Sequence, residues 1–250
     1  MKFKTMLKDA AIYSLSDWYN ILILGLTLFL TDYLIDFDVP FMIEGITDVL
    51  IVILIIFLSF LEIGYGFRIV EETVHGSSKP PGFHHPLNLM VHGIKESVIL
   101  GTYFILPMIM VIIGISEFEL MFKLDFSTII MEFALFIAII LFICFNILFQ
   151  GAVLNMAHHE GSIRSGFDMV MVFRKIKEVG LKNMFFITMI NIVVIYILKQ
   201  AIFDTMHEFY FLGTTFWGNI TLGDLLSTVL IAPFLILFTT RLLGLIDLKD

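Results

Sequence analysis

Two ionisable residues in an apolar stretch are the strongest candidates for chemistry in this chain. Glu62 lies well inside the run 49–68, and Arg68 closes it. A carboxylate at membrane depth is costly and by default marks a functional site, such as a step on an ion or substrate path. The alternative is structural, with Arg68 at the interface and Glu62 held by Arg68 or by Tyr65. Glu62 and Arg68 therefore form a candidate intramembrane pair, functional or structural.

Histidines are the second group with chemical potential, because six of the seven lie in two segments: His75, His84, His85, His92, His158 and His159. A divalent ion needs three or four converging ligands, and Glu71, Glu72 and Glu160 are close in sequence. Neighbouring histidines point in different directions, however, and no H-E-x-x-H motif or partner cysteine accompanies them. We therefore expect no resident metal or other cofactor. The secondary metal candidates are His84, His85, His92, His158 and His159, and a pH-sensing face is a further reading.

Two prolines and a basic run complete the candidate residues. Pro107 and Pro233 fall within apolar runs, where each breaks a backbone hydrogen bond and predicts a kink. Such kinks line cavities in transporters but also occur in inert membrane helices. The basic residues expected to contact lipid head groups are Arg174, Lys175, Lys177 and Lys182. Each cation near an anionic leaflet contributes about 1 kcal/mol.

The composition indicates that the protein is surrounded by lipid. The chain is 59% hydrophobic and 15% charged, whereas soluble domains have about 45–50% apolar and about 25% charged residues. So much apolar surface requires lipid. The net charge of −8 argues against a nucleic-acid partner, and the single cysteine excludes an intrachain disulfide. No phosphate-cradling glycine loop or serine–histidine nucleophile pattern is present, so we assign no catalytic residue.

The elements that position these residues are predicted to be transmembrane helices, because only helices or closed barrels satisfy the backbone in lipid. Six runs approach the roughly 20 residues that a span requires. They cover 18–36, 49–68, 98–115, 127–149, 184–203 and 225–245. The expected fold is an all-α integral membrane protein, with residues 1–250 forming one polytopic domain.

Orientation follows from the positive charges. Of the Lys and Arg residues, 13 fall before the first run, after the last, or between runs two and three and runs four and five. Only Lys123 and Lys199 fall on the other side. The positive-inside rule then predicts a multi-pass protein of the cell membrane with both termini in the cytoplasm.

Two segments on the expected cytoplasmic side are predicted to be interfacial amphipathic helices. Segment 86–97 places Leu87, Val91 and Ile94 on one stripe, opposite Asn88, His92 and Lys95. Segment 166–180 places Val172, Ile176 and Val179 opposite Asp168, Arg174, Lys175 and Lys177.

The two segments also resemble each other. Val74-His75-Gly76 and His159-Glu160-Gly161 precede them, and they contain Ile94-Lys95-Glu96 and Ile176-Lys177-Glu178. Spans two and three are therefore predicted to repeat as spans four and five, in parallel. A rival pairing sets spans one to three against four to six as an inverted repeat, with Pro107 and Pro233 in equivalent places.

A loose pattern of Gly, Pro and aromatic residues around these segments resembles a known family. It includes Gly64-Tyr65-Gly66-Phe67-Arg68-Ile69-Val70, Pro80-Pro81-Gly82-Phe83, Gly93-Ile94-Lys95, Tyr103-Phe104-Ile105-Leu106-Pro107 and Gly161-Ser162-Ile163-Arg164-Ser165-Gly166-Phe167-Asp168. The pattern is similar to the multi-pass domain-of-unknown-function family numbered four thousand and thirteen, common in methanogenic archaea, over roughly residues 60–245. The resemblance implies a helical membrane protein and supplies no catalytic residues.

Three functions stay open from the sequence. The leading hypothesis is a non-enzymatic scaffold, partner-binding or lipid-organising module, whose partners are the lipid bilayer and a membrane protein or a second copy. The alternative is a small transporter or permease component in which Glu62, Pro107 and Pro233 line a path. The third is a membrane enzyme acting on lipid head groups through cytoplasmic His and Glu residues.

Overall fold

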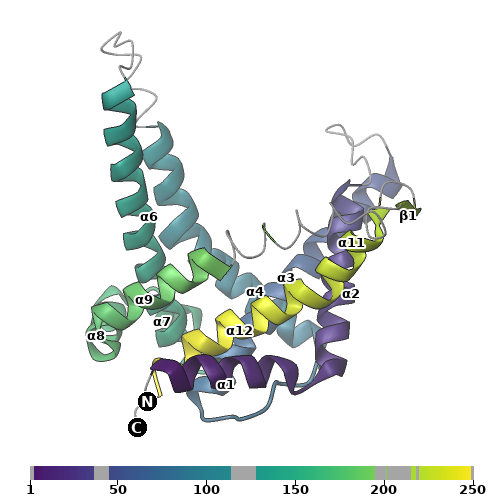
Figure 1. Cartoon of the computed structure of the whole chain (residues 1–250), viewed down its shortest axis with the longest axis horizontal. Helices are drawn as coiled ribbons and strands as arrows, with labels where there is room; N and C mark the ends of the chain where they lie inside the picture. The colour runs from purple at the N-terminus through teal and green to yellow at the C-terminus, as the bar shows by residue number, and fades with distance from the viewer. Residues whose placement is uncertain are drawn as a thin grey trace.

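Long apolar helices form most of the described chain. The computed structural model describes residues 3–36, 45–113, 128–194, 201, 215–217 and 220–248. Helix α1 (Phe3–Leu15) lies across the end of the molecule at which both termini meet, which we call the base (Figure 1). The helices that rise from the base are α2 (Trp18–Asp36), α3 (Ile46–Val74), α4 (Pro86–Leu100), α6 (Thr128–Ala157) and α12 (Ala232–Leu245). The shorter helices are α7 (Ile163–Gly166), α8 (Met169–Val179), α9 (Leu181–Asn191) and α11 (Leu222–Leu226).

Three further elements complete the described parts. The π-helical turns η1 (Gly101–Ile105) and η3 (Ser227–Ile231) continue α4 and precede α12, respectively. A short antiparallel hairpin pairs β1 (Thr215–Trp217) with β2 (Ile220–Thr221).

Five helical runs of the described residues are long and apolar enough to cross a membrane by length and composition: Trp18–Ile35, Ile46–Val74, Pro86–Ile113, Phe136–Ala157 and Leu222–Leu245. They overlap five of the six predicted spans. At the remaining one, predicted for 184–203, the structure has a shorter apolar helix, Leu181–Val194. Residues 195–200 and 202–203 of that span lie outside the described residues. So do residues 114–115 of the predicted span 98–115 and residue 127 of the predicted span 127–149.

The prediction of a separate interfacial helix over 86–97 is wrong. Helix α4 runs from Pro86 directly into η1 and on to Ile113 without a break. Its stripe of Leu87, Val91 and Ile94 is 38–69% exposed rather than packed on protein. In a spanning helix the apolar stripe meets lipid, which is as apolar as a protein core, while small residues face neighbouring helices. The buried side of α4 carries Leu89 and Gly93, whereas Asn88 of the predicted polar side is exposed.

The second predicted amphipathic segment does form a separate helix. Asp168 caps α8 by accepting a hydrogen bond from the backbone N–H of Met171 at 3.1 Å. Val172, Ile176 and Val179, the predicted apolar face, are buried in the protein core, whereas an interfacial helix would turn them toward lipid. Gly180, with φ of 92°, then separates α8 from α9, since an L side chain rarely adopts that backbone angle. This element therefore lies at the base with its apolar face covered.

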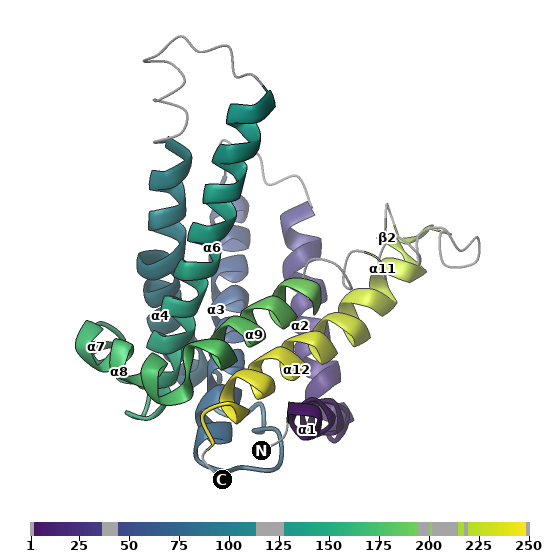
Figure 2. The same ribbon diagram turned by 60° about the vertical axis from the view of Figure 1, so that its left-hand side comes forward.

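Helices α3 and α4 approach each other so closely that their backbones touch. A Cβ at Gly64 would lie 1.8 Å from the carbonyl oxygen of Leu89, and one at Gly93 would lie 1.9 Å from that of Phe60. Only glycine fits at both positions, which is how small residues bring membrane helices together. Helix α4 also stands beside α6 (Figure 2). Polar groups on the protein-facing side of α4 are consequently held in a tight junction.

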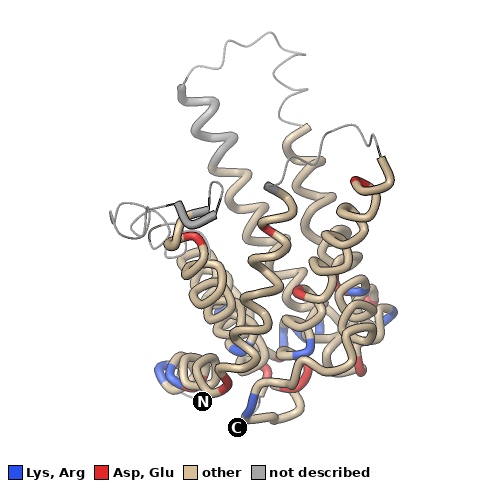
Figure 3. The backbone as a smooth tube through the Cα atoms, turned by 90° about the vertical axis from the view of Figure 1, so that its right-hand side faces the viewer, with Lys and Arg blue, Asp and Glu red and all other residues tan. Residues whose placement is uncertain are grey.

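The described Lys and Arg residues gather at the base, whereas acidic residues also lie farther from it (Figure 3). Figure 3 shows the described Lys and Arg residues toward the end that carries both termini. The main apolar cluster also lies there, where α3, α6, α8 and α12 meet, with Phe67, Val70, Met156, Val172 and Leu242 in its centre. The base therefore combines the best-packed part of the described chain with its cations.

Candidate functional site

Glu62 lies between α2 and α3 and has a partner that the sequence did not predict. Its Oε1 accepts a hydrogen bond from the Thr31 hydroxyl at 2.6 Å. The same Thr31 oxygen lies 3.0 Å from the backbone oxygen of Thr27. The carboxyl group is thus fixed at a contact between two apolar helices.

The predicted contact between Glu62 and Arg68 is not formed, and neither is one between Glu62 and Tyr65. Arg68 Nε lies 3.3 Å from Glu72 Oε1, and its Nη1 donates to the His84 carbonyl oxygen at 3.3 Å. Tyr65 donates to the Pro81 carbonyl oxygen at 3.0 Å. Residues six apart lie about 120° apart around an α-helix, whereas residues four apart share a face. Helix periodicity explains why Arg68 pairs with Glu72 and not with Glu62.

The candidate metal histidines are placed in different surroundings. His84 and His85 lie in the turn before α4, and His85 occupies the left-handed region at φ 58°. The ring of His92 stacks on Phe67 with centroids 5.5 Å apart. His159 Nδ1 lies 2.7 Å from the carbonyl oxygen of Asn155. Within the described ranges, no three His, Cys, Asp or Glu residues gather in a way that could hold a metal ion.

His158 instead joins a buried charge cluster with the segment after α12. Its Nε2 lies 2.5 Å from Asp247 Oδ2, and Lys175 Nζ lies 3.3 Å from the same carboxylate. The Asp247 side chain is almost completely buried. The cluster ties the end of α6 and helix α8 to the C-terminal segment. Sequence reasoning missed it, because its members are up to 89 residues apart.

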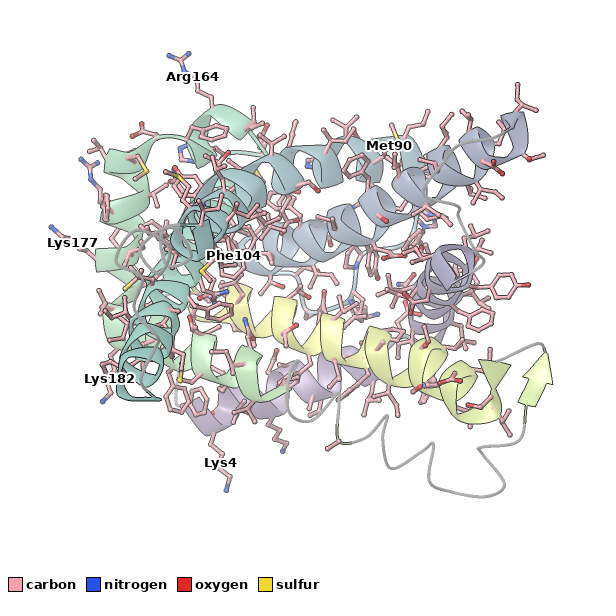
Figure 4. All side chains as sticks on the ribbon, turned by 90° about the horizontal axis from the view of Figure 1, so that it is seen from above. Lys4, Met90, Phe104, Arg164, Lys177 and Lys182 are labelled. Atoms are coloured by element: carbon pink, nitrogen blue, oxygen red, sulfur yellow. The ribbon has the colours of Figure 1, made fainter. Side chains whose placement is uncertain are left out.

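The structure revises the set of cations expected at lipid head groups. Lys175 is drawn into the cluster with Asp247 and is therefore largely buried, while Arg174, Lys177 and Lys182 are exposed. Seen from above, the side chains of Lys4, Arg164, Lys177 and Lys182 point outward from the rim (Figure 4). These four cations lie along one side of the base, whereas Lys175 is turned inward to Asp247 (Figure 4).

A hollow of about 530 Å³ opens at the base beside these cations. Its lining residues come from the end of α6, the following turn, α7 and the start of α8: Asn155, His158, His159, Glu160, Ser162, Arg164, Ser165, Asp168 and Met171. Two hydrogen bonds shape it, one from Asn155 Nδ2 to the Ser165 oxygen at 2.7 Å and one from the Tyr103 hydroxyl to the Gly166 oxygen at 2.9 Å. The sequence indicated the charged residues but not this hollow, which depends on the turn geometry.

Each of the two prolines predicted to kink a helix lies just after a π-helical turn, in which the backbone hydrogen bonds span five residues and not four. The π-turn η1 ends two residues before Pro107, and η3 ends two residues before Pro233. A proline lacks the N–H that the preceding turn would use, and a π-turn accommodates the altered pattern without ending the helix. The same local arrangement thus occurs twice, in α4 and before α12.

Comparison with known families decides what kind of protein carries these features. A family model described as a protein of unknown function (DUF4013) matches residues 49–203. The chain belongs to this family. No curated protein and no solved structure matches it.

The family match covers most of α3 and all of α4, α6, α7, α8 and α9. It begins earlier and ends earlier than the range 60–245 that the loose motifs indicated. Thr31, Pro233, Arg241 and Asp247 therefore lie outside the matched region, although they contact or parallel residues within it. Glu62 lies within the family region, whereas its hydrogen-bond partner Thr31 lies outside it.

Proposed function

We propose that the protein is a non-enzymatic membrane module that binds and organises anionic lipids in the leaflet at its base. The observation that carries this proposal is the group of exposed cations Arg174, Lys177 and Lys182 on and beside α8, of which Lys177 and Lys182 point outward in Figure 4. Beside those cations, Val170 and Phe173 expose apolar side chains on the outer face of α8. Exposed apolar and basic groups together favour a helix lying in the head-group region.

The energetics support selective contact with anionic lipids. Each exposed cation near the leaflet surface contributes about 1 kcal/mol, or roughly fivefold in local lipid enrichment. Helix α8 is held in place by its buried Val172 and Ile176 and by the pairing of Lys175 with Asp247. Arg174, Lys177 and Lys182 are consequently presented from a fixed platform, which reduces the ordering entropy that lipid binding would otherwise cost.

Spin-labelled lipids test this proposal directly. The protein is reconstituted in vesicles, and electron paramagnetic resonance measures the preference of its boundary lipid for an anionic over a zwitterionic head group. Replacing Arg174, Lys177 and Lys182 together by Gln should lower that preference by at least roughly tenfold at low salt, and less at high salt.

The matched control keeps the three charges and changes only the side chains. Arg174→Lys, Lys177→Arg and Lys182→Arg together should leave the preference near that of the unmodified protein. An unchanged preference in the triple variant, with the fold retained, would remove lipid organisation as the function.

We further infer the topology that this function requires. The segment beginning with Leu181–Val194 supplies a sixth span, and the base faces the cytoplasm. The concentration of Lys and Arg at the base supports this orientation.

A parallel repeat of spans two and three in spans four and five belongs to the same proposal. His75 ends α3 with its Nδ1 2.7 Å from the carbonyl oxygen of Glu71, four residues earlier. His159 makes the equivalent contact with Asn155 at 2.7 Å. Gly76 and Gly161, at positive φ, follow these histidines. The turns after α3 and after α6 thus share the same histidine contact and a glycine at positive φ. This likeness supports duplication of the hairpin.

Transport is the second candidate, favoured by the fixed carboxyl of Glu62 and the paired π-turns before Pro107 and Pro233. Intramembrane carboxylates and irregular helices are typical of transport paths. Under this reading, Glu62→Gln abolishes solute or ion flux in proteoliposomes while the thermal stability stays close to that of the unmodified protein. Thr27→Ala serves as the control, because the Thr27 hydroxyl donates within α2 to the Ile23 oxygen and makes no hydrogen bond to the carboxylate. Flux that survives Glu62→Gln would exclude Glu62 from any path.

A further inference from the structure

The hollow at the base is bordered by charges of both signs. Arg164, Glu160 and Asp168 all line it, so one cation and two carboxylates surround the same space of about 530 Å³. Pockets that bind small molecules have volumes of about 300–1,000 Å³. Within the part of the chain that the structure describes, neither Arg164 nor Glu160 makes a side-chain hydrogen bond or an ion pair. Both groups are therefore open to a ligand.

The cationic side of the hollow suits a phosphate group. Arg164 lies on α7, and its side chain points away from the helices (Figure 4). A guanidinium binds phosphate oxygens through two parallel N–H···O hydrogen bonds. Ser162, two residues earlier, also lines the hollow, and its hydroxyl makes no hydrogen bond among the described residues. A phosphate would thus find one charged and one neutral donor on this side.

The acidic side of the hollow suits an ammonium group. Glu160 lies in the turn after α6 at φ 51°, and Asp168 accepts the Met171 N–H through Oδ1 only, which leaves Oδ2 as an acceptor. His159 adds a third acceptor. Its Nδ1 lies 2.7 Å from the Asn155 carbonyl oxygen, which can only accept, so Nδ1 carries the proton and Nε2 of the neutral ring does not.

An apolar surface continues from the acidic side of the hollow. Met169 and Val170 directly follow Asp168 along the chain and are 43% and 70% exposed. Phe173, about one turn beyond Val170, is exposed as well. Acyl chains attached to a ligand in the hollow could cover these side chains, whereas a soluble phosphate ester could not. The neighbouring surface therefore favours a lipid as the ligand.

We propose that the hollow binds the head group of a phospholipid with a primary ammonium group, such as phosphatidylethanolamine. Arg164 and Ser162 hold the phosphate, while Glu160 and Asp168 accept hydrogen bonds from the ammonium group. A trimethylated ammonium has no N–H to donate to these carboxylates. The inference rests on the proposed function for the position of the base among lipid head groups. It adds a second specificity, because the exposed cations of α8 select net negative charge and the hollow selects the ammonium group.

Native mass spectrometry of the full chain in detergent tests this proposal with two lipids of equal acyl-chain length. Phosphatidylethanolamine and phosphatidylcholine both have zero net charge, so the exposed cations of α8 do not distinguish them. We expect phosphatidylethanolamine to bind at least roughly tenfold more tightly, because only its ammonium group donates hydrogen bonds to the carboxylates. Free phosphoethanolamine has the same head group without acyl chains. In excess it should displace the bound lipid, with a weaker affinity than the lipid has.

Variants assign the preference to the hollow. Glu160→Gln together with Asp168→Asn should reduce the preference to nearly one, and asparagine retains the helix cap of α8. Arg164→Gln should weaken the binding of both lipids by roughly tenfold and leave the preference, because both lipids carry the phosphate. The matched controls are Glu178→Gln and Arg174→Gln, which change exposed residues of α8 that do not line the hollow. Both controls should keep the affinity and the preference of the unmodified protein.

Equal binding of the two lipids by the unmodified protein would overturn the proposal, and so would a preference that survives in the carboxylate double variant. Equal affinity for free phosphoethanolamine and for the lipid would remove the lipid as the ligand. The anionic selectivity of the proposed function depends on Arg174, Lys177 and Lys182, none of which lines the hollow. Unchanged anionic preference in that triple variant, beside an intact preference for phosphatidylethanolamine, would reject the proposed function and leave this inference standing.

Discussion

Arg241 shows how one buried side chain connects distant parts of this protein. Its Nε donates to Asp9 Oδ1 at 3.0 Å, and its Nη1 donates to the Thr73 hydroxyl at 3.1 Å and to the Ser77 carbonyl oxygen at 2.6 Å. The guanidinium also lies over the Tyr13 ring, 4.3 Å from its centroid. Burial raises the pKa of the Tyr13 hydroxyl, which therefore stays neutral beneath the cation. Planar, multidentate recognition of this kind suits arginine and not lysine.

Arg241→Gln should destabilise the protein by about 2–3 kcal/mol. Breaking a buried ion pair usually costs about 3–5 kcal/mol, but the partner Asp9 is partly exposed and recovers some hydration. Arg241→Lys should fall in between, because it keeps the charge and loses the fork. Thermal unfolding in a fixed detergent measures both variants, with exposed Arg174→Gln as the control. Equal stability of Arg241→Gln and the control would show that the network contributes nothing.

At the scale of elements, α4 is a helix whose start the sequence predicts but whose surroundings it does not. The apolar runs and Pro86 correctly indicated a helix starting at that residue. The pattern could not say whether the apolar stripe of Leu87, Val91 and Ile94 meets protein or lipid, since both are apolar. The opposite side is occupied by Gly93 and Glu96, and only the packed structure identifies these as contact positions. At α8 the pattern predicted a separate helix with one apolar face, but not that this face packs on protein.

Gly93→Ala should separate α3 from α4 and cost about 3 kcal/mol or more. The added methyl group would lie 1.9 Å from the Phe60 carbonyl oxygen, and overpacking against backbone cannot relax through a side-chain rotation. Gly101→Ala is the matched control on the same helical run, since its Cβ would meet nothing within 4 Å. Denaturation in sodium dodecyl sulfate monitored by circular dichroism compares the two. Similar unfolding curves for both variants would contradict the close contact.

The predicted site residues show the same limit. Glu62 was identified from its depth in an apolar run, yet its partner Thr31 lies 31 residues away and no local pattern marks it. Arg68 pairs with Glu72, four residues on, because residues six apart, such as Glu62 and Arg68, lie on different sides of a helix. The hollow beside Gly161 and the Asp247 cluster depend on turns and long-range contacts, which composition and spacing do not encode.

At the scale of the whole molecule, five described helical runs of spanning length, family membership and a cationic base describe a multi-pass membrane protein. Gly45 begins α3 at the end opposite the base, and Ser77 lies in the turn that follows α3 at the base. The two positions are therefore separated by the full length of one span.

Cysteine labelling should place these two positions on opposite sides of the membrane. In a Cys144→Ser background, Gly45→Cys should react with a membrane-impermeant maleimide added to intact cells. Ser77→Cys should react only after the membrane is opened, because the positive-inside rule places the base in the cytoplasm. Mass spectrometry or a gel shift gives the labelled fraction. Labelling of the Ser77 variant in intact cells would reverse the proposed orientation.

The contact between Asp9 and Arg241 spans 232 residues and so sets an order of events during biosynthesis. Chains grow at about 5–20 residues per second, so α1 exists for on the order of ten to fifty seconds before α12 is made. During that time Asp9 and Tyr13 have no guanidinium to pack against, and the base stays open. The helices of the family region can meanwhile insert and pair through Gly64 and Gly93. The contact of Asp9 with Arg241 is then a late step, because it waits for the last described helix.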